Sequence, residues 1–412
     1  MTTHASSNLP GPSSPTTTPM APGSLAISPW RALAPICGIV FMEFLAMGLP
    51  LPVLPGHVHG TLGFGTFVVG LAIGVQSWAT LLTRHGAGTW SDRRGPRSAT
   101  VLGLGLSVLA GVAYVLSCAV AEPSASLGVL LVGRALLGLG EGLVITGALA
   151  WGVGLLGRER SGLVMSWVGV AMYGALAAGA PLGSLLHARH GFAGMSLSST
   201  LAPLMALGLV VLVRAVRPVG GARLPFHRVI GSIWLPGLGL MLGALAFGAI
   251  AAFSTLRFEQ EGWSHAALAM TAFGVAYVLA RLLLGGLPDR IGGARVAMAS
   301  AAVTMVGQLG MWLASSATMA VGAAALTGLG FSLAFPSFGV EAIRRVPPHN
   351  RGVALGAYAA CFDVTMGVGV PLLGVVVGAG GYDAAFAVGA IMALGSLLVA
   401  AVLQSGGQRT PQ

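Results

Sequence analysis

Four ionisable side chains lie well inside long apolar runs of this sequence. They are Glu43, Arg134, Glu141 and Asp363. A charged group is costly in an apolar medium, so each should face a polar cavity or a partner. Burial raises the pKa of a carboxyl group and a nearby arginine lowers it, so such a group can load and release protons near neutral pH.

The spacing of these residues limits how they can pair. Arg134 and Glu141 are seven residues apart. On a helix this places both on one face but about 10 Å apart along the axis, too far for an ion pair. Arg134 is therefore expected to pair across helices, with Glu43 as the candidate. Glu141 or Glu43 is the candidate proton carrier, and Asp363 is the third. The alternative is a structural ion pair that only fixes helix packing.

The composition indicates what must position these groups. Of 412 residues, 55% are hydrophobic and only 8% are charged, and the mean hydropathy is +0.86. A soluble domain carries about a quarter charged residues, so a water-exposed surface is excluded. The apolar material falls in runs of about 20 residues, the length that crosses a bilayer as a helix. The 64 glycines are typical of closely packed membrane helices.

We therefore predict an all-α integral membrane protein with twelve transmembrane helices in two six-helix repeats. The expected helices are 31–53, 66–87, 98–119, 126–150, 162–186, 192–213, 231–255, 267–287, 294–315, 318–341, 352–378 and 383–404. The expected domains are a disordered cytoplasmic tail (1–29), an N-terminal bundle (30–213), a cytoplasmic linker (214–230), a C-terminal bundle (231–405) and a second tail (406–412).

The arginines predict the orientation. With the amino terminus inside, eighteen of the 21 basic residues fall on the inner side, Arg189 and Arg257 fall outside, and Arg134 lies within a helix. This bias predicts that both termini are cytoplasmic, in a multi-pass protein of a bacterial-type inner membrane. The net charge of +10 is then expected to meet membrane lipids, not nucleic acid. Arg84, at the end of its helix, is expected to reach lipid headgroups.

The sequence repeats itself. G-x-x-x-D-R-x-G occurs at Gly88, Asp92, Arg93 and Gly95 and again at Gly285, Asp289, Arg290 and Gly292. The pairs Gly138 and Gly328, Gly162 and Gly352, Pro181 and Pro371, and Gly191 and Gly381 are each 190 residues apart. A constant offset across several helices predicts two related halves, an arrangement that transporters use.

With these motifs, the whole chain after the tail resembles the major facilitator superfamily, and stretches such as GRALLGLGEG and GFSLAFPSFGVEAIRRVP are similar to its YhhS/YfcJ-type transporters. The resemblance implies that Asp92 and Arg93 hold a cytoplasmic gate closed. Asp289 and Arg290 are the equivalent residues of the second half. R-x-x-x-G-x-G at Arg134 resembles the pattern of proton-coupled exporters. GAPLG around Pro181 resembles the antiporter motif, although Ala180 stands where the family usually has Gly. Pro181 and Pro371 are the expected helix bends.

Polar and aromatic side chains within the helices are candidates for contacting substrate. They are Gln76, Trp151, Trp167, Tyr173 and Tyr358, with Trp167 and Tyr173 preferred. The alternative for each is ordinary helix packing.

The leading functional hypothesis is a monomeric secondary transporter that exports a small organic solute in exchange for protons by alternating access. One alternative is a proton symporter that imports a sugar or organic acid. A second is a membrane sensor or membrane-embedded enzyme, but the sequence contains no H-E-x-x-H, G-x-S-x-G or phosphate-binding loop. No metal site or cofactor is expected.

Overall fold

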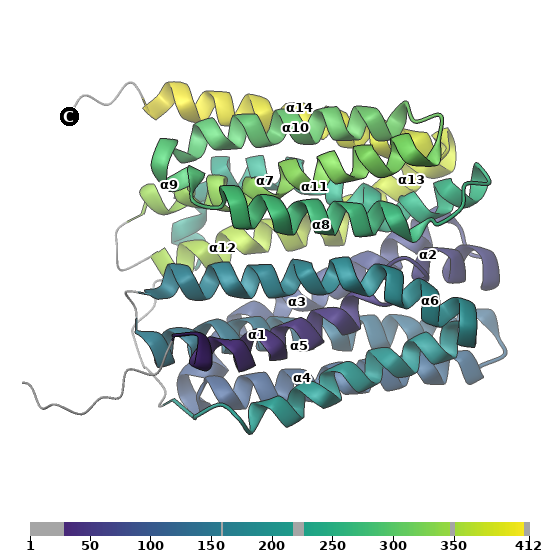
Figure 1. Cartoon of the computed structure of the whole chain (residues 1–412), viewed down its shortest axis with the longest axis horizontal. Coiled ribbons are helices and arrows are strands. Elements are labelled where there is room, and N and C mark those ends of the chain that lie inside the picture. Colours follow the sequence, from purple (N-terminus) through teal and green to yellow (C-terminus); the bar gives the residue numbers. More distant parts are fainter. Residues whose placement is uncertain (1–28, 158–159, 217–225, 347–350, 408–412) are drawn as a thin grey trace, which may run out of the picture.

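A computed structural model describes residues 29–157, 160–216, 226–346 and 351–407. Within these ranges the regular secondary structure is entirely helical (Figure 1). Backbone groups in lipid must bond within their own segment, and helices achieve this. Residues 1–28 and 408–412 of the expected tails, 217–225 of the expected linker, and residues 158–159 and 347–350 lie outside the described residues.

The N-terminal half contains six membrane-length segments. Its elements are α1 (Pro29–Gly48), α2 (Leu54–Gly56), the π-helical turn η1 (His57–Thr61), α3 (Thr66–Arg94), α4 (Pro96–Ala119), α5 (Pro123–Leu156) and α6 (Ser161–Val210). The 50-residue α6 is two helices in one, because the chain turns back at Gly191, where φ is 66° and ψ is −171°. Figure 1 shows this reversal at the right-hand end of the molecule.

The C-terminal half repeats this plan. Its elements are α7 (Phe226–Gln260), α8 (Ala267–Leu284), α9 (Leu287–Ile291), α10 (Gly293–Trp312), α11 (Ala317–Arg344), α12 (Arg351–Val364), the π-helical turn η4 (Thr365–Gly369), α13 (Val370–Gly380) and α14 (Tyr382–Gly407). α12, η4 and α13 together form one long segment. Pro371 follows the π-helical turn directly, whereas Pro181 continues α6 without a non-helical dihedral angle.

Ten helices in the described residues are long and apolar enough to cross a membrane. α6 counts once among them although it holds two antiparallel segments. α10 is not among the ten, and it carries the polar residues Ser300, Thr304 and Gln308. It packs between α11 and α14, which bury this polar face. The described chain is therefore an all-α membrane fold of two six-helix halves.

Several expected boundaries differ from the structure by five to seven residues; α5 ends at Leu156 instead of 150, and α7 spans Phe226–Gln260 instead of 231–255. The first predicted helix ran to residue 53, but α1 ends at Gly48, before Pro50 and Pro52. The second was predicted to end at 87, but α3 continues to Arg94. Asp92 and Arg93 therefore lie on the last turn of a helix and not in a loop. The turn itself is Gly95 (φ 90°), and its counterpart Gly292 has φ 98°, a region that favours glycine.

Glycines make the same helix contacts in both halves. Gly138 of α5 packs directly against the backbone carbonyl of Gln76 on α3. Gly328 of α11 packs in the same way against the carbonyl of Phe273 on α8. Gln76 and Phe273 are 197 residues apart, the same offset as the two D-R-x-G signatures. Close backbone approach is what small residues allow between membrane helices, so the repeat preserves packing positions.

The two halves lie side by side, the N-terminal half below and the C-terminal half above in Figure 1. They touch along two seams, α3 with the α12–η4–α13 segment and α6 with α8. On the first seam the Thr66 hydroxyl donates to the Gly374 carbonyl at 2.7 Å, and the Trp78 indole donates to the Gly367 carbonyl at 2.9 Å. The start of α1 and the end of α14 lie at the same end of the molecule.

Candidate functional site

An ion pair joins the two halves along the first seam. Arg84 of α3 binds the carboxylate of Asp363 on α12 through two donors, with Nη2 to Oδ1 at 3.1 Å and Nε to Oδ2. The Asp363 side chain is 4% exposed and that of Arg84 is 26% exposed. Bidentate pairing in a place with little water is the strong form of this interaction. The expected headgroup contact of Arg84 is therefore wrong, because Arg84 points to the opposite half.

Glu141 of α5 lies next to this ion pair. The Gln76 amide donates to its Oε2 at 2.8 Å and the Thr80 hydroxyl donates to the same oxygen at 3.3 Å. The Gly138 carbonyl, 3.0 Å from the Thr80 hydroxyl, is an alternative acceptor for the same hydrogen. Glu141 is close enough to both Arg84 and Asp363 to interact with them electrostatically. One cation and two carboxylates therefore share the region where the halves meet.

Glu43 of α1 is the third carboxylate in the membrane interior. It is 1% exposed, and its Oε1 accepts from the Ser107 hydroxyl at 2.5 Å. Its Oε2 has no hydrogen-bond partner among the described residues. Glu43 and Glu141 both line one small cavity. Gln76 and Leu137 also line it. This cavity is too small for an organic solute, but it brings two carboxyl groups to one space.

The structure does not pair Arg134 with Glu43. The buried guanidinium of Arg134 donates instead to the backbone carbonyls of Ala72 at 2.8 Å and Ile73 at 3.4 Å, both on α3. Its Nη1 has no partner within the described residues. These two carbonyl contacts tie Arg134, and with it α5, to α3 and not to Glu43.

Aromatic rings occupy the C-terminal side of the same region. Tyr173 of α6 stacks on Tyr277 of α8, with ring centroids 3.6 Å apart. Tyr277 continues into a cluster formed by Phe247, Phe273, Phe331 and Phe362. The N-terminal half thus supplies Gln76, Glu141 and Tyr173 to this region, and the C-terminal half supplies Asp363 and most of the rings.

The other substrate-cavity candidates are engaged in contacts with neighbouring helices and backbone. Trp151 is fully buried and donates to the Arg214 carbonyl at 2.8 Å. Trp167 packs edge-on against Trp30, with centroids 4.4 Å apart. Tyr358 is buried and donates to the Phe335 carbonyl at 2.8 Å. Each of these side chains makes contacts that stabilise helix packing. Gln76 and Tyr173 are the two candidates that lie at the meeting of the halves.

Extending the repeated signature eight residues towards the amino terminus would have marked Arg84 as a repeated position. Arg84 precedes Asp92 by eight residues, and Arg281 precedes Asp289 by eight residues. In the second half, the Arg281 guanidinium donates to the Ser332 carbonyl at 3.4 Å and lies beside Gly169 of α6. The position equivalent to Asp363 by the 190-residue offset is Tyr173. The two halves therefore place an arginine alike, but only one of them supplies a carboxylate.

The two D-R-x-G signatures have the same backbone turn but differ in how exposed their side chains are. Asp92 is half-buried at the end of α3, and Arg93 beside it is exposed. Asp289 and Arg290, on α9, are both exposed. Gly88 and Gly285 each precede the signature aspartate by one helical turn.

Comparison with known proteins identifies the relatives of this fold. A family profile described as Major Facilitator Superfamily matches residues 36–268 and 237–411. An uncharacterized MFS-type transporter of Salmonella typhimurium is 41% identical over 361 residues, covering 87% of this chain and 93% of the relative. One from Pseudomonas aeruginosa is 41% identical over 393 residues, covering 95% and 98%.

Solved structures with the same fold are more distant in sequence. A crystal structure of a nucleoside transporter superposes with a TM-score of 0.73 at 15% identity, covering 91% of this chain and 99% of the other. A D-xylose-proton symporter superposes with a TM-score of 0.72 at 14% identity, covering 91% and 96%. At this identity the likeness concerns the fold alone.

Proposed function

Because this chain belongs to the major facilitator superfamily, a family of membrane transporters and not of enzymes, we propose that it is a proton-coupled exporter of a small organic solute. It works by alternating access, in which one half rocks against the other. The observation that carries the proposal is the Arg84–Asp363 ion pair between the halves, with Glu141 beside it.

The ion pair gives proton binding a mechanical consequence. Opening the seam between α3 and α12 separates Arg84 from Asp363 and leaves two poorly solvated charges. A proton on Asp363 removes the negative charge and with it most of the attraction. Protonation therefore favours separation of the halves at this seam, and deprotonation favours closure. This coupling is what an exchanger needs, because a ligand shifts a conformational equilibrium only by binding two states differently.

Glu141 is the proposed proton carrier, and Glu43 is the second site. Glu141 contacts Gln76 and Thr80, which can hydrogen-bond either the charged or the protonated carboxyl group. Glu43 lines the same small cavity as Glu141, so the two proposed sites are neighbours. Arg134, held by backbone carbonyls, contributes a fixed positive charge to the same helix as Glu141.

The direction of transport rests on sequence motifs. The R-x-x-x-G-x-G stretch at Arg134 and the GAPLG stretch at Pro181 favour export by antiport. Gly179 and Gly183 pack directly on the backbone of Gly48 and Leu49 at the end of α1, so the GAPLG stretch forms a close helix contact. We also propose that both termini face the cytoplasm of a bacterial-type inner membrane and that the transporter acts as a monomer.

Transport measurements test this function. Purified protein is first screened by thermal shift against drugs, sugars and amino acids, because a ligand of the folded state raises the melting temperature. A hit is then added to everted vesicles that report internal pH with a dye. An exporter releases protons from the acidified lumen as it takes up the solute. Proton and solute movement in the same direction would instead identify a symporter.

Three variants and one control localise the coupling. The interior variants are Glu141→Gln, Glu43→Gln and Asp363→Asn. We expect solute-driven proton release to fall at least tenfold in the variant that removes the proton carrier. Glu122→Gln is the matched control, since Glu122 is exposed and caps the start of α5 outside the membrane span. If all three interior variants release protons as the control does, the carboxylates are structural and the coupling assignment is wrong.

A further inference from the structure

Arg281 lies on α8, in the seam with α6 where the two halves meet for the second time. Its guanidinium points to neighbouring helices. Nη1 donates to the Ser332 carbonyl of α11 at 3.4 Å, and Nη2 lies 3.9 Å from the position that a Cβ would take on Gly169 of α6. A hydrogen bond of 3.4 Å is long for an N–H donor and a carbonyl. A charged group inside a membrane span needs better partners than this one.

Three other arginines within the membrane helices are better satisfied. Arg84 binds a carboxylate through two donors, and Arg134 donates to two backbone carbonyls. Arg257 donates to backbone carbonyls and pairs with the carboxylate of Asp383. Arg281 has one hydrogen bond and forms no ion pair among the described residues. A guanidinium carries five N–H donors, so most of those of Arg281 are available to a ligand.

The internal repeat identifies the partner that Arg281 lacks. Arg84 and Arg281 are 197 residues apart, the offset of the two signatures, and the carboxylate that binds Arg84 belongs to Asp363. At the equivalent place on α6 the chain has Tyr173, and the guanidinium of Arg281 lies beside Gly169. No other atom of a neighbouring segment lies within 4 Å of the missing Cβ of this glycine. The second seam therefore has room where the first seam has a carboxylate.

Tyrosines border this guanidinium. Tyr173 stacks on Tyr277 with ring centroids 3.6 Å apart, and both are close enough to Arg281 to interact with it electrostatically. A tyrosine hydroxyl can donate a hydrogen bond to an anion. The ring of Tyr277 also faces those of Phe273 and Phe331, so aromatic surface continues from the cation into the C-terminal half. The place offers a positive charge, hydroxyl groups and rings to one ligand.

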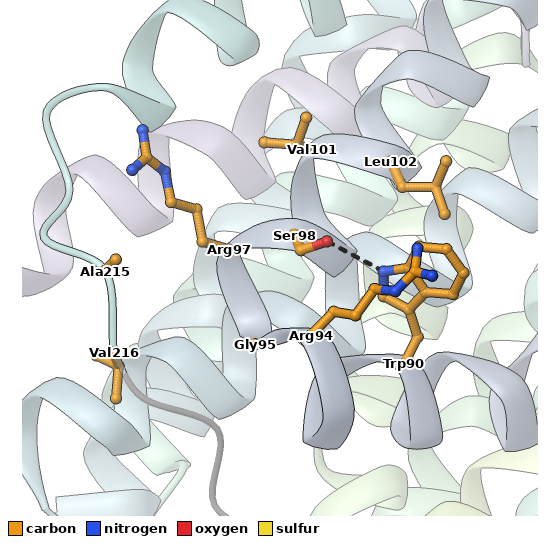
Figure 2. Close-up of a pocket in the computed structure, with 9 residues that line it drawn as sticks. All are labelled: Trp90, Arg94, Gly95, Arg97, Ser98, Val101, Leu102, Ala215 and Val216. Atoms are coloured by element: carbon orange, nitrogen blue, oxygen red, sulfur yellow. Dashed lines mark hydrogen bonds between the residues drawn. The ribbon is translucent and has the colours of Figure 1, made fainter.

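A larger cavity elsewhere does not offer this arrangement. It has a volume of about 650 Å³ and lies where α3 ends and α4 begins (Figure 2). Arg94 lies over the Trp90 ring, 4.3 Å from its centroid, and Arg97 points away from it on the other side of Ser98. Two cations that diverge do not hold one anion between them. Arg281, by contrast, directs its donors into the seam between the halves.

We propose that Arg281 binds the carboxylate of the transported solute, which is therefore a small organic acid. The acid takes beside Gly169 the place that Asp363 has on Arg84, and its body lies by the rings of Tyr173 and Tyr277. A carboxylate accepts two parallel N–H bonds from a guanidinium, which the single carbonyl of Ser332 cannot do. The assignment rests on the transport function proposed above, because it concerns the solute that this function moves.

Binding of matched acids and amides to the purified full-length chain tests the assignment. The probes are benzoate with benzamide, phenylacetate with phenylacetamide, and succinate with succinamide. A bound ligand raises the melting temperature, so thermal unfolding in detergent compares the members of each pair without a proton gradient. At least one acid should bind, and its amide should bind about tenfold more weakly, because a charged hydrogen bond is replaced by a neutral one. If no acid binds better than its amide, the assignment is wrong.

Two variants locate the acid at Arg281. Arg281→Gln should bind acid and amide alike, because the cation is lost. Gly169→Asp places a carboxylate beside the guanidinium and should weaken acid binding about tenfold without lowering the melting temperature of the free protein. Arg295→Gln, which removes an exposed arginine at the start of α10, is the matched control and should keep the preference for the acid. An unchanged preference in Arg281→Gln, or unchanged acid binding in Gly169→Asp if the first variant does not fold, would overturn the assignment.

The dye assay in everted vesicles separates this assignment from the proposed proton coupling. An acid that binds through Arg281 but drives no proton release would contradict the coupling and leave the binding site in place. Proton release driven by benzamide or another neutral solute, with no acid bound, would contradict the binding site and leave the coupling in place. The expected result is proton release driven by the acid and lost in Arg281→Gln.

Discussion

Arg84 and Asp363 form one ion pair through which proton binding can influence how the two halves sit against each other. They are 279 residues apart, one in each half, and form the described ion pair that crosses the seam of α3 and α12. Glu141 of α5 is close enough to interact electrostatically with both members of this pair. In the proposed cycle, a proton bound by Asp363 or Glu141 changes the net charge at the place where the halves separate.

We predict that removing one partner of this pair is worse than removing both. Asp363→Asn or Arg84→Gln alone leaves a poorly solvated charge or polar group and should destabilise the protein by about 3 kcal/mol. The double variant should recover at least half of that loss, because neither member of the pair is then left facing a missing partner. Thermal unfolding of the four proteins in detergent measures this. Additive losses in the double variant would mean that the two side chains do not interact.

Helices in this protein are positioned by glycines at repeated places. Gly138 and Gly328 bring α5 onto α3 and α11 onto α8, so the carbonyls of Gln76 and Phe273 sit where a Cβ would be. The contact of α5 with α3 also sets the distance over which Gln76 and Thr80 reach Glu141. The element that packs closely is thus the element that orients the proposed proton carrier.

Gly138→Val is expected to push α5 away from α3. The added side chain overlaps backbone that cannot yield cheaply, so we expect a loss of about 1–3 kcal/mol. Proton coupling should fall with it, because the Gln76–Glu141 hydrogen bond lengthens. Thermal stability in detergent and the dye assay are the two readouts. Gly105→Ala on α4, where no atom lies within 4 Å of the new Cβ, is the control and should behave as the unaltered protein. Equal stability in the two variants would contradict the close-packing argument.

At the scale of the whole molecule, the two halves meet along most of α3. Thr66 contacts Gly374 near one membrane face, Trp78 contacts Gly367 farther along, and Arg84 contacts Asp363 toward the other face. The contacts near Thr66 are small and backbone-based, whereas those near Arg84 are charged. Alternating access requires each end of this seam to open in turn.

A reversible cross-link at the Thr66 end tests this requirement. A Cβ on Gly378 would lie 3.2 Å from Oγ1 of Thr66, which suits a disulfide. In a background with Cys37, Cys118 and Cys361 replaced by serine, Thr66→Cys with Gly378→Cys should lose transport at least tenfold on oxidation and regain it with a reductant. The single variant Thr66→Cys should be insensitive to the oxidant. Full transport by the cross-linked protein would show that this end of the seam need not open.

The sequence by itself determined the class of this protein and its repeat. Low charge and runs of about 20 apolar residues require membrane helices, because lipid offers backbone groups no other partner. The D-R-x-G signatures and the 190-residue offset predicted two related halves, and Gly95 and Gly292 share the same left-handed turn. These features are local or periodic, so they are visible along the chain. The gate role of Asp92 and Arg93 stays a prediction.

Only the tertiary structure decided which charges meet. The rotation of each helix about its axis sets the direction of its side chains, and no pattern within one apolar run records which neighbour it faces. Arg84 was therefore expected to contact lipid headgroups, but in the structure it binds Asp363. Arg134 was expected to pair with Glu43, but in the structure it donates to the carbonyls of Ala72 and Ile73. Both differences arise because contacts between helices far apart in sequence depend on packing in three dimensions.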